Sequence, residues 1–168
     1  MTIIIRAAEP SDYAAICETM AQPIARTNTL QLPFPSLEMW KKRLAEFPVG
    51  DHFLVADVDG KVVGNLGLHA AGKQMRRRHV GSVGMAVHDA FHGRGVGSAL
   101  MTAALDLADN WLQYSRLELE VYIDNVGAIS LYQKFGFVVE GTHPKDSFRN
   151  GIYIDCLSMG RLRPEKTG

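Results

Sequence analysis

The chain has 168 residues, 46% of them hydrophobic, which is the size and composition of one domain with a full core. Its 18 basic and 18 acidic residues cancel, which argues against a broad basic surface for nucleic acid and favours a small ligand. Cys17 and Cys156 lie far apart without a C-x-x-C motif, as expected of reduced core thiols, and no segment approaches the length of a membrane span. We predict a single cytoplasmic domain, residues 1–168, with neither nucleic acid nor a membrane as partner.

The N-terminal part of the chain shows the patterns of a strand, two helices and a hairpin. Apolar residues recur at helical spacing in two segments, and two apolar runs flank the turn sequence Asp59-Gly60. Ser11 or a neighbour, and later Ser36, stand where helix N-caps are preferred, and three prolines between them predict a loop. The expected elements are a strand at Ile3–Ala7, a helix to about Met20, a loop at Ala21–Pro35, a helix carrying Leu37, Trp40, Leu44 and Phe47, and strands at Phe53–Val58 and Lys61–His69.

The rest of the chain predicts a mixed sheet with two further helices. Asp124-Asn125 is a turn signal, and Gly136 stands where a glycine ends a helix. The expected elements are a basic loop at Ala71–Arg78, a strand at Val80–Val87, a helix at Ser98–Leu112 with Leu100, Ala104, Leu107 and Trp111 facing the sheet, a strand at Arg116–Tyr122, a short helix at Ala128–Phe135, and strands at Phe137–Gly141 and Tyr153–Arg161. The fold class is therefore α/β (α+β).

Three alternating glycines, Gly93, Gly95 and Gly97, join the strand ending at Val87 to the long helix. Glycine takes backbone conformations that are closed to residues with a Cβ, and it lets a ligand approach the main chain closely. The start of the following helix attracts anions through its dipole and its unpaired N–H groups. This loop is predicted to hold a phosphate or pyrophosphate.

Two well-known phosphate loops do not fit these glycines. A P-loop needs a Lys after its last glycine, and none is present. A dinucleotide fingerprint needs a third glycine where Ser98 or Leu100 stands. Glu118 and Glu120 lie at the distance of a ribose-binding acid, so a dinucleotide site stays open as an alternative.

A second motif runs from Asn125 to Phe137 and has the pattern N-x-x-A-I-x-L-Y-x-K-x-G-F. With His92-Gly93-Arg94-Gly95-Val96-Gly97, it resembles the two signature motifs of the GNAT N-acetyltransferases, and in particular the bacterial amino-acid N-acyltransferase branch. The likeness extends from Ile3 to about Arg161. It implies a single N-acetyltransferase domain whose mixed, mostly antiparallel central sheet is flanked by helices.

The resemblance implies that acetyl-CoA is the co-substrate. Pantetheine would run beside the strand residues Met85, Ala86 and Val87, and Asn125 would hold it or cap the following helix. The pyrophosphate would rest on the backbone of a run of seven residues, namely His92, Gly93, Arg94, Gly95, Val96, Gly97 and Ser98. The family usually has Gln or Arg where this chain has His92, whose imidazole still offers a hydrogen-bond donor. The basic run Arg76-Arg77-Arg78-His79 either meets the 3′-phosphate of coenzyme A or an acidic acceptor, or is a solvated loop.

Acetyl transfer to an amine needs a base for the protonated amine and an acid for the leaving thiolate. Tyr132 occupies the position where the family places its general acid and is also predicted to line the coenzyme site. Many relatives place a Glu about where Ser82 stands, so that base is missing. Glu120 matches the catalytic Glu of some relatives, and it shares one strand face with Glu118. Glu120 as base, Glu120 as a structural or substrate-positioning carboxylate, and water relayed by backbone carbonyls all stay open.

The resemblance places the acceptor groove beside the loop after the first helix, at Asn28, Thr29, Leu30 and Gln31. We expect the acceptor to be a small primary amine, first of all the α-amine of an amino acid. Polyamine, antibiotic and protein N-terminal acetylation, and an acyl-CoA-binding module without catalysis, are the alternatives. No metal is expected, because no histidine has metal-ligand spacing with cysteines or acids. A homodimer is expected, with the strand Tyr153–Arg161 or the segment Lys145–Asn150 near its interface.

Overall fold

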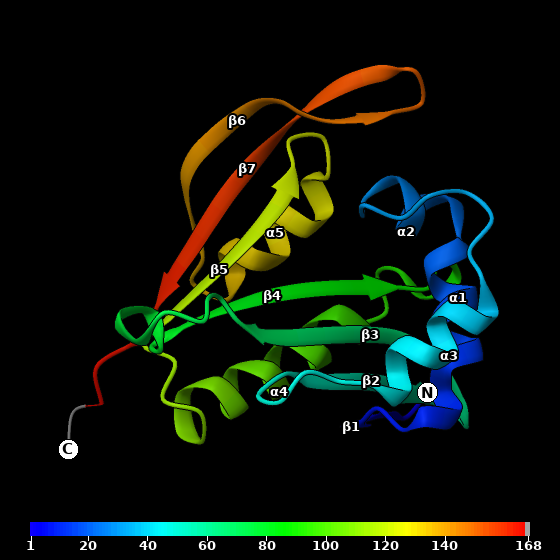
Figure 1. Cartoon of the computed structure of the whole chain (residues 1–168), viewed down its shortest axis with the longest axis horizontal. Helices are drawn as coiled ribbons and strands as arrows, with labels where there is room; N and C mark the ends of the chain where they lie inside the picture. Colours follow the sequence, from blue (N-terminus) through cyan, green and yellow to red (C-terminus); the bar gives the residue numbers. More distant parts are fainter. Residues whose placement is uncertain (167–168) are drawn as a thin grey trace. The chain divides into compact units, whose positions relative to one another are not determined.

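The structure is a computed structural model that describes residues 1–166 (Figure 1). The first half of the chain contains β1 Ile3–Ala7, η1 Pro10–Asp12, α1 Tyr13–Ala21, α2 Pro23–Thr27, α3 Leu37–Ala45, β2 His52–Val58, β3 Lys61–Ala70 and η2 Met75–Arg77. The second half contains β4 Val80–Val87, η3 Asp89–Phe91, α4 Val96–Asn110, β5 Arg116–Tyr122, α5 Val126–Lys134, β6 Val138–Arg149 and β7 Ile152–Leu162. Across these residues, no helix is long and apolar enough to cross a membrane.

Seven strands form one sheet with the order β1-β2-β3-β4-β5-β7-β6, and helices flank it (Figure 1). The pairs β1–β2, β2–β3, β5–β7 and β6–β7 are antiparallel, whereas β4 pairs with β5 in parallel over Val80–Ser82. The prediction of a mixed, mostly antiparallel sheet is confirmed. Asp59 and Gly60, with φ of 51° and 88°, make the tight turn between β2 and β3 that the Asp-Gly pair predicts.

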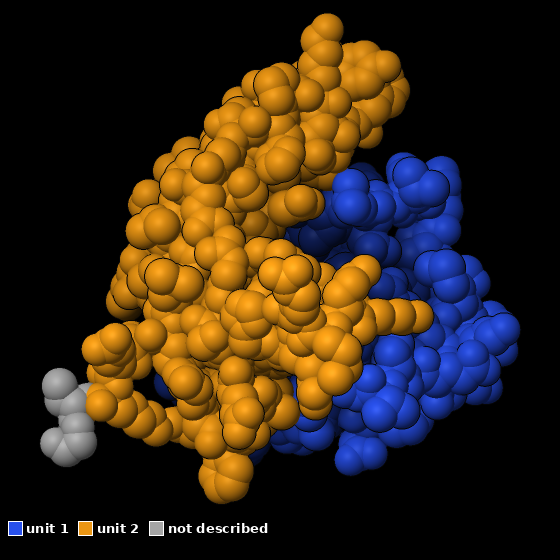
Figure 2. Space-filling model, turned by 60° about the vertical axis from the view of Figure 1, so that its left-hand side comes forward, with its two compact units in different colours: residues 1–69, 84–104 blue, residues 70–83, 105–168 orange. Residues whose placement is uncertain are grey.

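The chain divides into two compact units, coloured separately in Figure 2. Unit 1 comprises Met1–His69 and Gly84–Ala104, and unit 2 comprises Ala70–Val83 and the chain from Leu105 onward. Strand β4 runs from unit 2 into unit 1, and helix α4 runs from unit 1 into unit 2.

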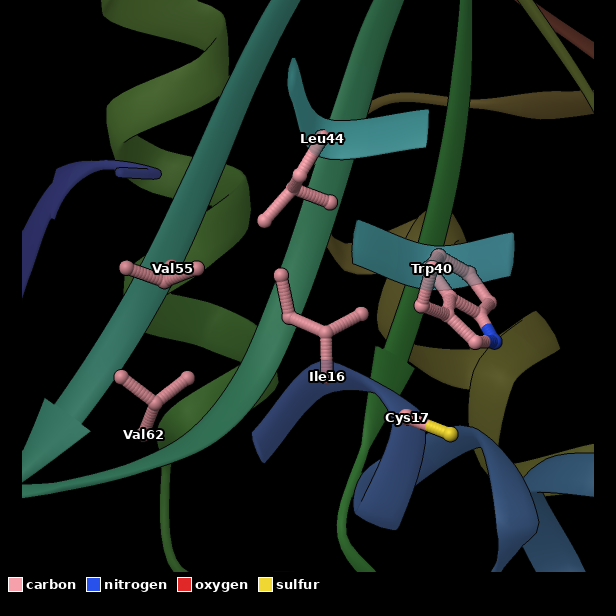
Figure 3. Close-up of a cluster of buried hydrophobic side chains, with 6 residues drawn as sticks. All are labelled: Ile16, Cys17, Trp40, Leu44, Val55 and Val62. Carbon is pink, nitrogen blue, oxygen red and sulfur yellow. The ribbon is translucent and has the colours of Figure 1, made fainter. Parts of the chain in front are cut away.

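The core of unit 1 includes a cluster to which two helices and two strands contribute (Figure 3). Its members are Ile16 and Cys17 of α1, Trp40 and Leu44 of α3, Val55 of β2 and Val62 of β3. Ser36 caps α3 as predicted, because its hydroxyl accepts a hydrogen bond of 3.2 Å from the N–H of Met39. Leu37 of the same helix was expected on the buried face, but it is 55% exposed because it lies in the first turn.

The N-cap of α1 is Asp12, which agrees with the prediction of Ser11 or a neighbour, although the Asp12 side chain makes no capping hydrogen bond to α1. A 3-10 turn, η1, precedes the helix, and the carboxylate of Asp12 accepts a 2.8 Å hydrogen bond from the N–H of Glu9. The same carboxylate accepts two hydrogen bonds from Arg6, at 2.8 and 2.9 Å. The guanidinium of Arg6 therefore holds the pKa of Asp12 below its ordinary value.

The core of unit 2 includes one face of β5. Leu117, Leu119 and Val121 are buried, while Glu118 and Glu120 lie on the other face, as the alternation predicts. Arg161 of β7 is 7% exposed, and its guanidinium binds both oxygens of Asp109 on α4 at 2.9 and 2.7 Å. This bidentate pair satisfies the buried charge of Arg161.

Two element predictions in unit 2 are wrong. Trp111 is 74% exposed, because α4 ends at Asn110 and the chain turns away before Trp111 can reach the sheet. Strand β6 does not stop at Gly141 but continues to Arg149. Register shifts between Val139 and Gly141 and between His143 and Ser147 carry it past Pro144, which cannot donate to a regular ladder.

Candidate functional site

The glycine loop of unit 1 has the backbone shape that its glycines predict. Gly93 and Gly95 have φ of +70° and +84°, in the left-handed region that disfavours residues with a Cβ. A Cβ built at Gly93 meets nothing within 4 Å, and one at Gly95 meets only Ile3 Cδ1, at 4.0 Å. The loop is open beside both glycines, which leaves its backbone accessible to a ligand.

Helix α4 begins at Val96, two residues before the predicted start at Ser98. Its first helical hydrogen bond runs from the N–H of Ala99 to the oxygen of Gly95 and measures 2.9 Å. The N–H groups of Val96, Gly97 and Ser98 therefore belong to the first turn, where helices lack internal partners for their donors. Gly97 has helical backbone, so the expectation that it takes a conformation closed to other residues is wrong. These donors, at the positive end of a 15-residue helix, fit a pyrophosphate.

The histidine that replaces the family's usual Gln or Arg closes the loop onto its own strand. Nε2 of His92 lies 2.8 Å from the oxygen of Val87, and because a carbonyl only accepts, Nε2 carries the proton. Of the strand residues predicted to run beside pantetheine, Ala86 is buried, whereas Met85 and Val87 are half-buried. Arg94 stacks over Phe91, with 5.3 Å between its guanidinium carbon and the ring centre.

His88, directly after β4, connects the strand to α1. Its N–H donates to the oxygen of Val63 at 2.8 Å, and its Nδ1 accepts from the N–H of Ala90 at 3.2 Å. Its Nε2 therefore carries the proton and lies 3.4 Å from Oε1 of Glu18, which also pairs with Lys61 at 3.0 Å.

The predicted acceptor segment follows a short helix that sequence analysis missed. The range Ala21–Pro35 was expected to be a loop, but Pro23 begins helix α2 at the position where proline is favoured. Four residues were predicted to bind substrate, and they lie at and after the end of this helix: Asn28, Thr29, Leu30 and Gln31. Thr29 donates its hydroxyl proton to the oxygen of Ala25 at 2.9 Å, and Leu30 is 77% exposed.

Asp89 of η3 makes a long-range contact beside the candidate site that was not predicted from the sequence. Its Oδ2 accepts from the N–H of Ile24 at 2.9 Å, and its Oδ1 accepts from the N–H of Ala25 at 3.1 Å. The contact joins positions 65 and 64 residues apart. The sequence indicates this contact only through Pro23, which stands where helices often begin, and through the position of Asp89 just before the glycine loop.

In unit 2, the short helix α5 carries Tyr132 and begins directly after Asn125, the two residues of the second motif to which the resemblance assigns roles. The side chain of Asn125 caps α5 by accepting from the N–H of Ala128 at 3.3 Å. Tyr132 lies seven residues later, two turns along the same face. Gly136 follows the helix with φ of +89°, as the glycine in the motif predicts.

Tyr132 is 7% exposed and packs edge-on against Phe137, with ring centres 6.0 Å apart. Burial raises the pKa of its hydroxyl to about 12, because the phenolate would lose its hydration. Tyr132 therefore keeps its proton at neutral pH, which is the state that a general acid needs.

The two glutamates of β5 differ in their partners. Glu118 lies opposite Ser82 in the parallel pairing, and its carboxylate accepts from Arg77 at 3.1 Å and from Arg116 at 3.0 Å. Arg116 also donates to Glu140 at 2.9 Å. Within residues 1–166, Glu120 is exposed and makes no hydrogen bond or ion pair. Of the two carboxylates, Glu120 is the one without a cationic partner among the described residues.

Comparisons with known proteins agree with these motifs. Residues 19–137 match the acetyltransferase (GNAT) family. The chain is 47% identical over 161 residues to the L-amino acid N-acetyltransferase AaaT of Escherichia coli strain K12, covering 96% of this chain and 98% of that protein.

Solved structures share the fold over nearly the full length. A GNAT acetyltransferase from Streptococcus pneumoniae is 28% identical with a TM-score of 0.83, covering 97% of this chain and 100% of that one. A phosphinothricin acetyltransferase from Sinorhizobium meliloti, in complex with AcCoA, is 22% identical with a TM-score of 0.87, covering 99% of this chain and 91% of that one. The motifs, the family match and the full-length relatives lead to one conclusion: this chain belongs to the GNAT family of acetyltransferases.

Proposed function

We propose that this protein transfers the acetyl group of acetyl-CoA to the α-amine of an amino acid, directly and in a ternary complex. The observation that carries the proposal is the 47% identity, over 98% of its length, to a protein named as an L-amino acid N-acetyltransferase. The complex of the Sinorhizobium meliloti relative with AcCoA supports the choice of co-substrate through the shared fold.

Acetyl-CoA is proposed to bind through backbone groups of unit 1. The first-turn N–H groups of α4 and the open loop at Gly93 and Gly95 take the pyrophosphate. The strand Met85–Val87 runs beside the amides of pantetheine. The imidazole of His92 contributes by fixing the loop to Val87.

The chemical step is attack of the neutral amine nitrogen on the thioester carbonyl carbon, followed by cleavage of the carbon–sulfur bond. Tyr132 is proposed to give its phenolic proton to the leaving thiolate, and Asn125 to fix the start of the helix that carries Tyr132. Glu120 is proposed to take the proton that the amine loses, directly or through water. Its freedom from ion pairs within residues 1–166, in contrast to Glu118, supports this choice.

A homodimer, a cytoplasmic location and one N-acetyltransferase domain over residues 1–168 complete the proposal. The dimer is supported by exposed apolar side chains on β6, the last strand of the sheet order, and on its partner β7. They are Val138, Val139, Phe148, Ile152 and Tyr153, each between 46% and 64% exposed. Light scattering at micromolar concentration tests the dimer: a mass near 18.5 kDa contradicts it, and twice that mass supports it.

The function is tested by measuring thiol release from acetyl-CoA with a panel of amines. The panel holds L-amino acids including Phe and Met, the corresponding amines without a carboxylate, polyamines and short peptides with free N-termini. Turnover of amino acids above all other classes is expected. A preference for polyamines or peptides would show that the acceptor is not an amino acid. Tight acetyl-CoA binding without turnover of any amine would indicate a binding module without catalysis.

A further inference from the structure

The carboxylate of Asp89 makes two hydrogen bonds to successive peptide groups of α2. Ile24 and Ala25 donate them at 2.9 and 3.1 Å, and both N–H groups belong to the first turn of the helix. A helix of five residues has almost no stability of its own, because nucleation fixes several residues for each hydrogen bond gained. The cap from Asp89 therefore contributes a large share of what holds α2 together.

The backbone of Asp89 is fixed on the side of the glycine loop. The N–H of His92 donates to the oxygen of Asp89 at 3.3 Å, and the N–H of Phe91 donates to the oxygen of His88 at 2.8 Å. His88 is itself tied to β3 through Val63. Asp89 thus moves with η3 and with the loop that η3 leads into, while its side chain holds a helix from a distant part of the chain.

The same two residues of α2 also hold the start of the predicted acceptor segment through their carbonyl oxygens. The oxygen of Ile24 accepts from the N–H of Asn28 at 3.0 Å, and the oxygen of Ala25 accepts from the hydroxyl of Thr29 at 2.9 Å. That hydroxyl in turn accepts from the N–H of Gln31 at 3.4 Å. A continuous set of hydrogen bonds therefore runs from Asp89 through Ile24 and Ala25 to residues 28–31.

We propose that Asp89 is a positioning residue that couples the coenzyme-binding loop to the amine-binding segment. It acts through α2 and touches neither substrate. Ordering of the glycine loop by coenzyme A orders η3, and Asp89 transmits this order to residues 24–31, so that the amine meets a preformed segment. The proposal rests on the proposed function for the identity of the two substrates, but the set of hydrogen bonds that carries it does not.

The kinetic test compares Asp89→Ala with Asp89→Asn. Loss of a side-chain cap shifts a helix equilibrium by about 2-fold to 30-fold, and an affinity that depends on the capped state falls by up to that factor. We expect Asp89→Ala to raise KM for the amine within this range, while kcat and the Kd of acetyl-CoA measured without amine change less than about 2-fold. Asp89→Asn keeps one of the two acceptor oxygens and turns the other into an NH2 group that faces a backbone N–H, so it should raise KM by less than Asp89→Ala does.

Ser36→Ala is the matched control, because it removes the side-chain cap of another helix in the same unit. It should lower the melting temperature without changing KM for the amine. An unchanged KM in Asp89→Ala would overturn the proposal. So would an equal rise of KM in Ser36→Ala, or a loss of acetyl-CoA affinity as large as the rise in KM.

Hydrogen exchange tests the coupling without any turnover, so it stands even if the amine proves to be a different one. Coenzyme A should slow amide exchange of residues 24–31 in the wild type, less in Asp89→Asn, and not at all in Asp89→Ala. Equal protection in Asp89→Ala, or no protection by coenzyme A in the wild type, would show that Asp89 does not transmit order from the loop.

Discussion

Tyr132→Phe separates catalysis from folding, because it removes one oxygen and leaves the packing intact. The ring is 7% exposed and keeps its edge contact with Phe137 at 6.0 Å. Within residues 1–166 the hydroxyl has no hydrogen-bond partner, and burial alone accounts for its raised pKa. Deleting a hydroxyl that makes no hydrogen bond within the protein removes no such bond, so we expect the free energy of unfolding to change by less than about 1 kcal/mol.

The effect on turnover should be much larger than the effect on stability. A general acid contributes about 10²- to 10⁴-fold to a rate, and the thiolate of coenzyme A is a better leaving group than most. We therefore expect kcat to fall between severalfold and a thousandfold, which is about 1–4 kcal/mol of transition-state stabilisation. The Kd of acetyl-CoA should stay nearly constant, because only the transition state loses the interaction.

The assay is kcat from thiol release, with acetyl-CoA affinity by calorimetric titration and a melting curve on the same samples. Tyr114→Phe is the matched control, since Tyr114 is a buried tyrosine of the same unit with the same 7% exposure. It should leave kcat unchanged. An unchanged kcat in Tyr132→Phe, with chemistry shown to limit the rate, would remove Tyr132 from the role of acid.

Three further measurements probe the loop, the pH profile and the fold. Gly95→Val should weaken acetyl-CoA binding at least about 10-fold and lower the free energy of unfolding by about 1–2 kcal/mol. The loss of stability comes from φ of +84°, which strains any residue with a Cβ, and it stays small because the nearest atom, Ile3 Cδ1, lies 4.0 Å from that Cβ. An unchanged Kd for acetyl-CoA would place the phosphate elsewhere. Because burial raises the pKa of Tyr132 to about 12, this acid stays protonated up to about pH 10. The value of kcat/KM should therefore rise with pH as the amine loses its proton, and it should not fall again below about pH 10. A fall of kcat/KM near neutral pH would contradict this prediction. Asp12→Asn should lower the free energy of unfolding by about 1–3 kcal/mol at pH 7. Because Arg6 lowers the pKa of Asp12 in the folded state below the ordinary 3.8, the difference in stability between the variant and the wild type should shrink as the pH falls below that value. A constant difference in stability down to pH 3 would refute the pairing.

Local signals in the sequence predicted most of the elements that carry the site. Ser36, the Asp59-Gly60 turn and Gly136 act within a few residues of their own position, so their effects can be read from neighbouring letters. The alternation of apolar and acidic residues in β5 correctly placed Glu118 and Glu120 on the face opposite Leu117. It did so because successive side chains of a strand point to opposite faces, and the apolar ones here are the buried ones.

The features that sequence analysis missed depend on distant partners. Helix α2 is too short to be recognised by periodicity, and it forms where a carboxylate 65 residues away caps it. The ion pairs of Glu118 with Arg77 and Arg116 distinguish it from Glu120, but both glutamates look alike in the sequence. Strand β6 continues beyond Pro144 because it pairs with β7 there, although the proline itself is a residue that usually interrupts a strand.

The central claim is tested most directly by identifying the product of the complete reaction. The protein is incubated with acetyl-CoA and an equimolar mixture of L-amino acids, their decarboxylated amines and spermidine, and the acetylated products are identified by mass spectrometry. We predict N-acetyl amino acids in amounts equal to the coenzyme A released, and at least severalfold less of them when the Tyr132→Phe variant replaces the wild type for the same time. Acetyl groups found only on amines without a carboxylate, or coenzyme A released without any acetylated amine, would contradict the claim.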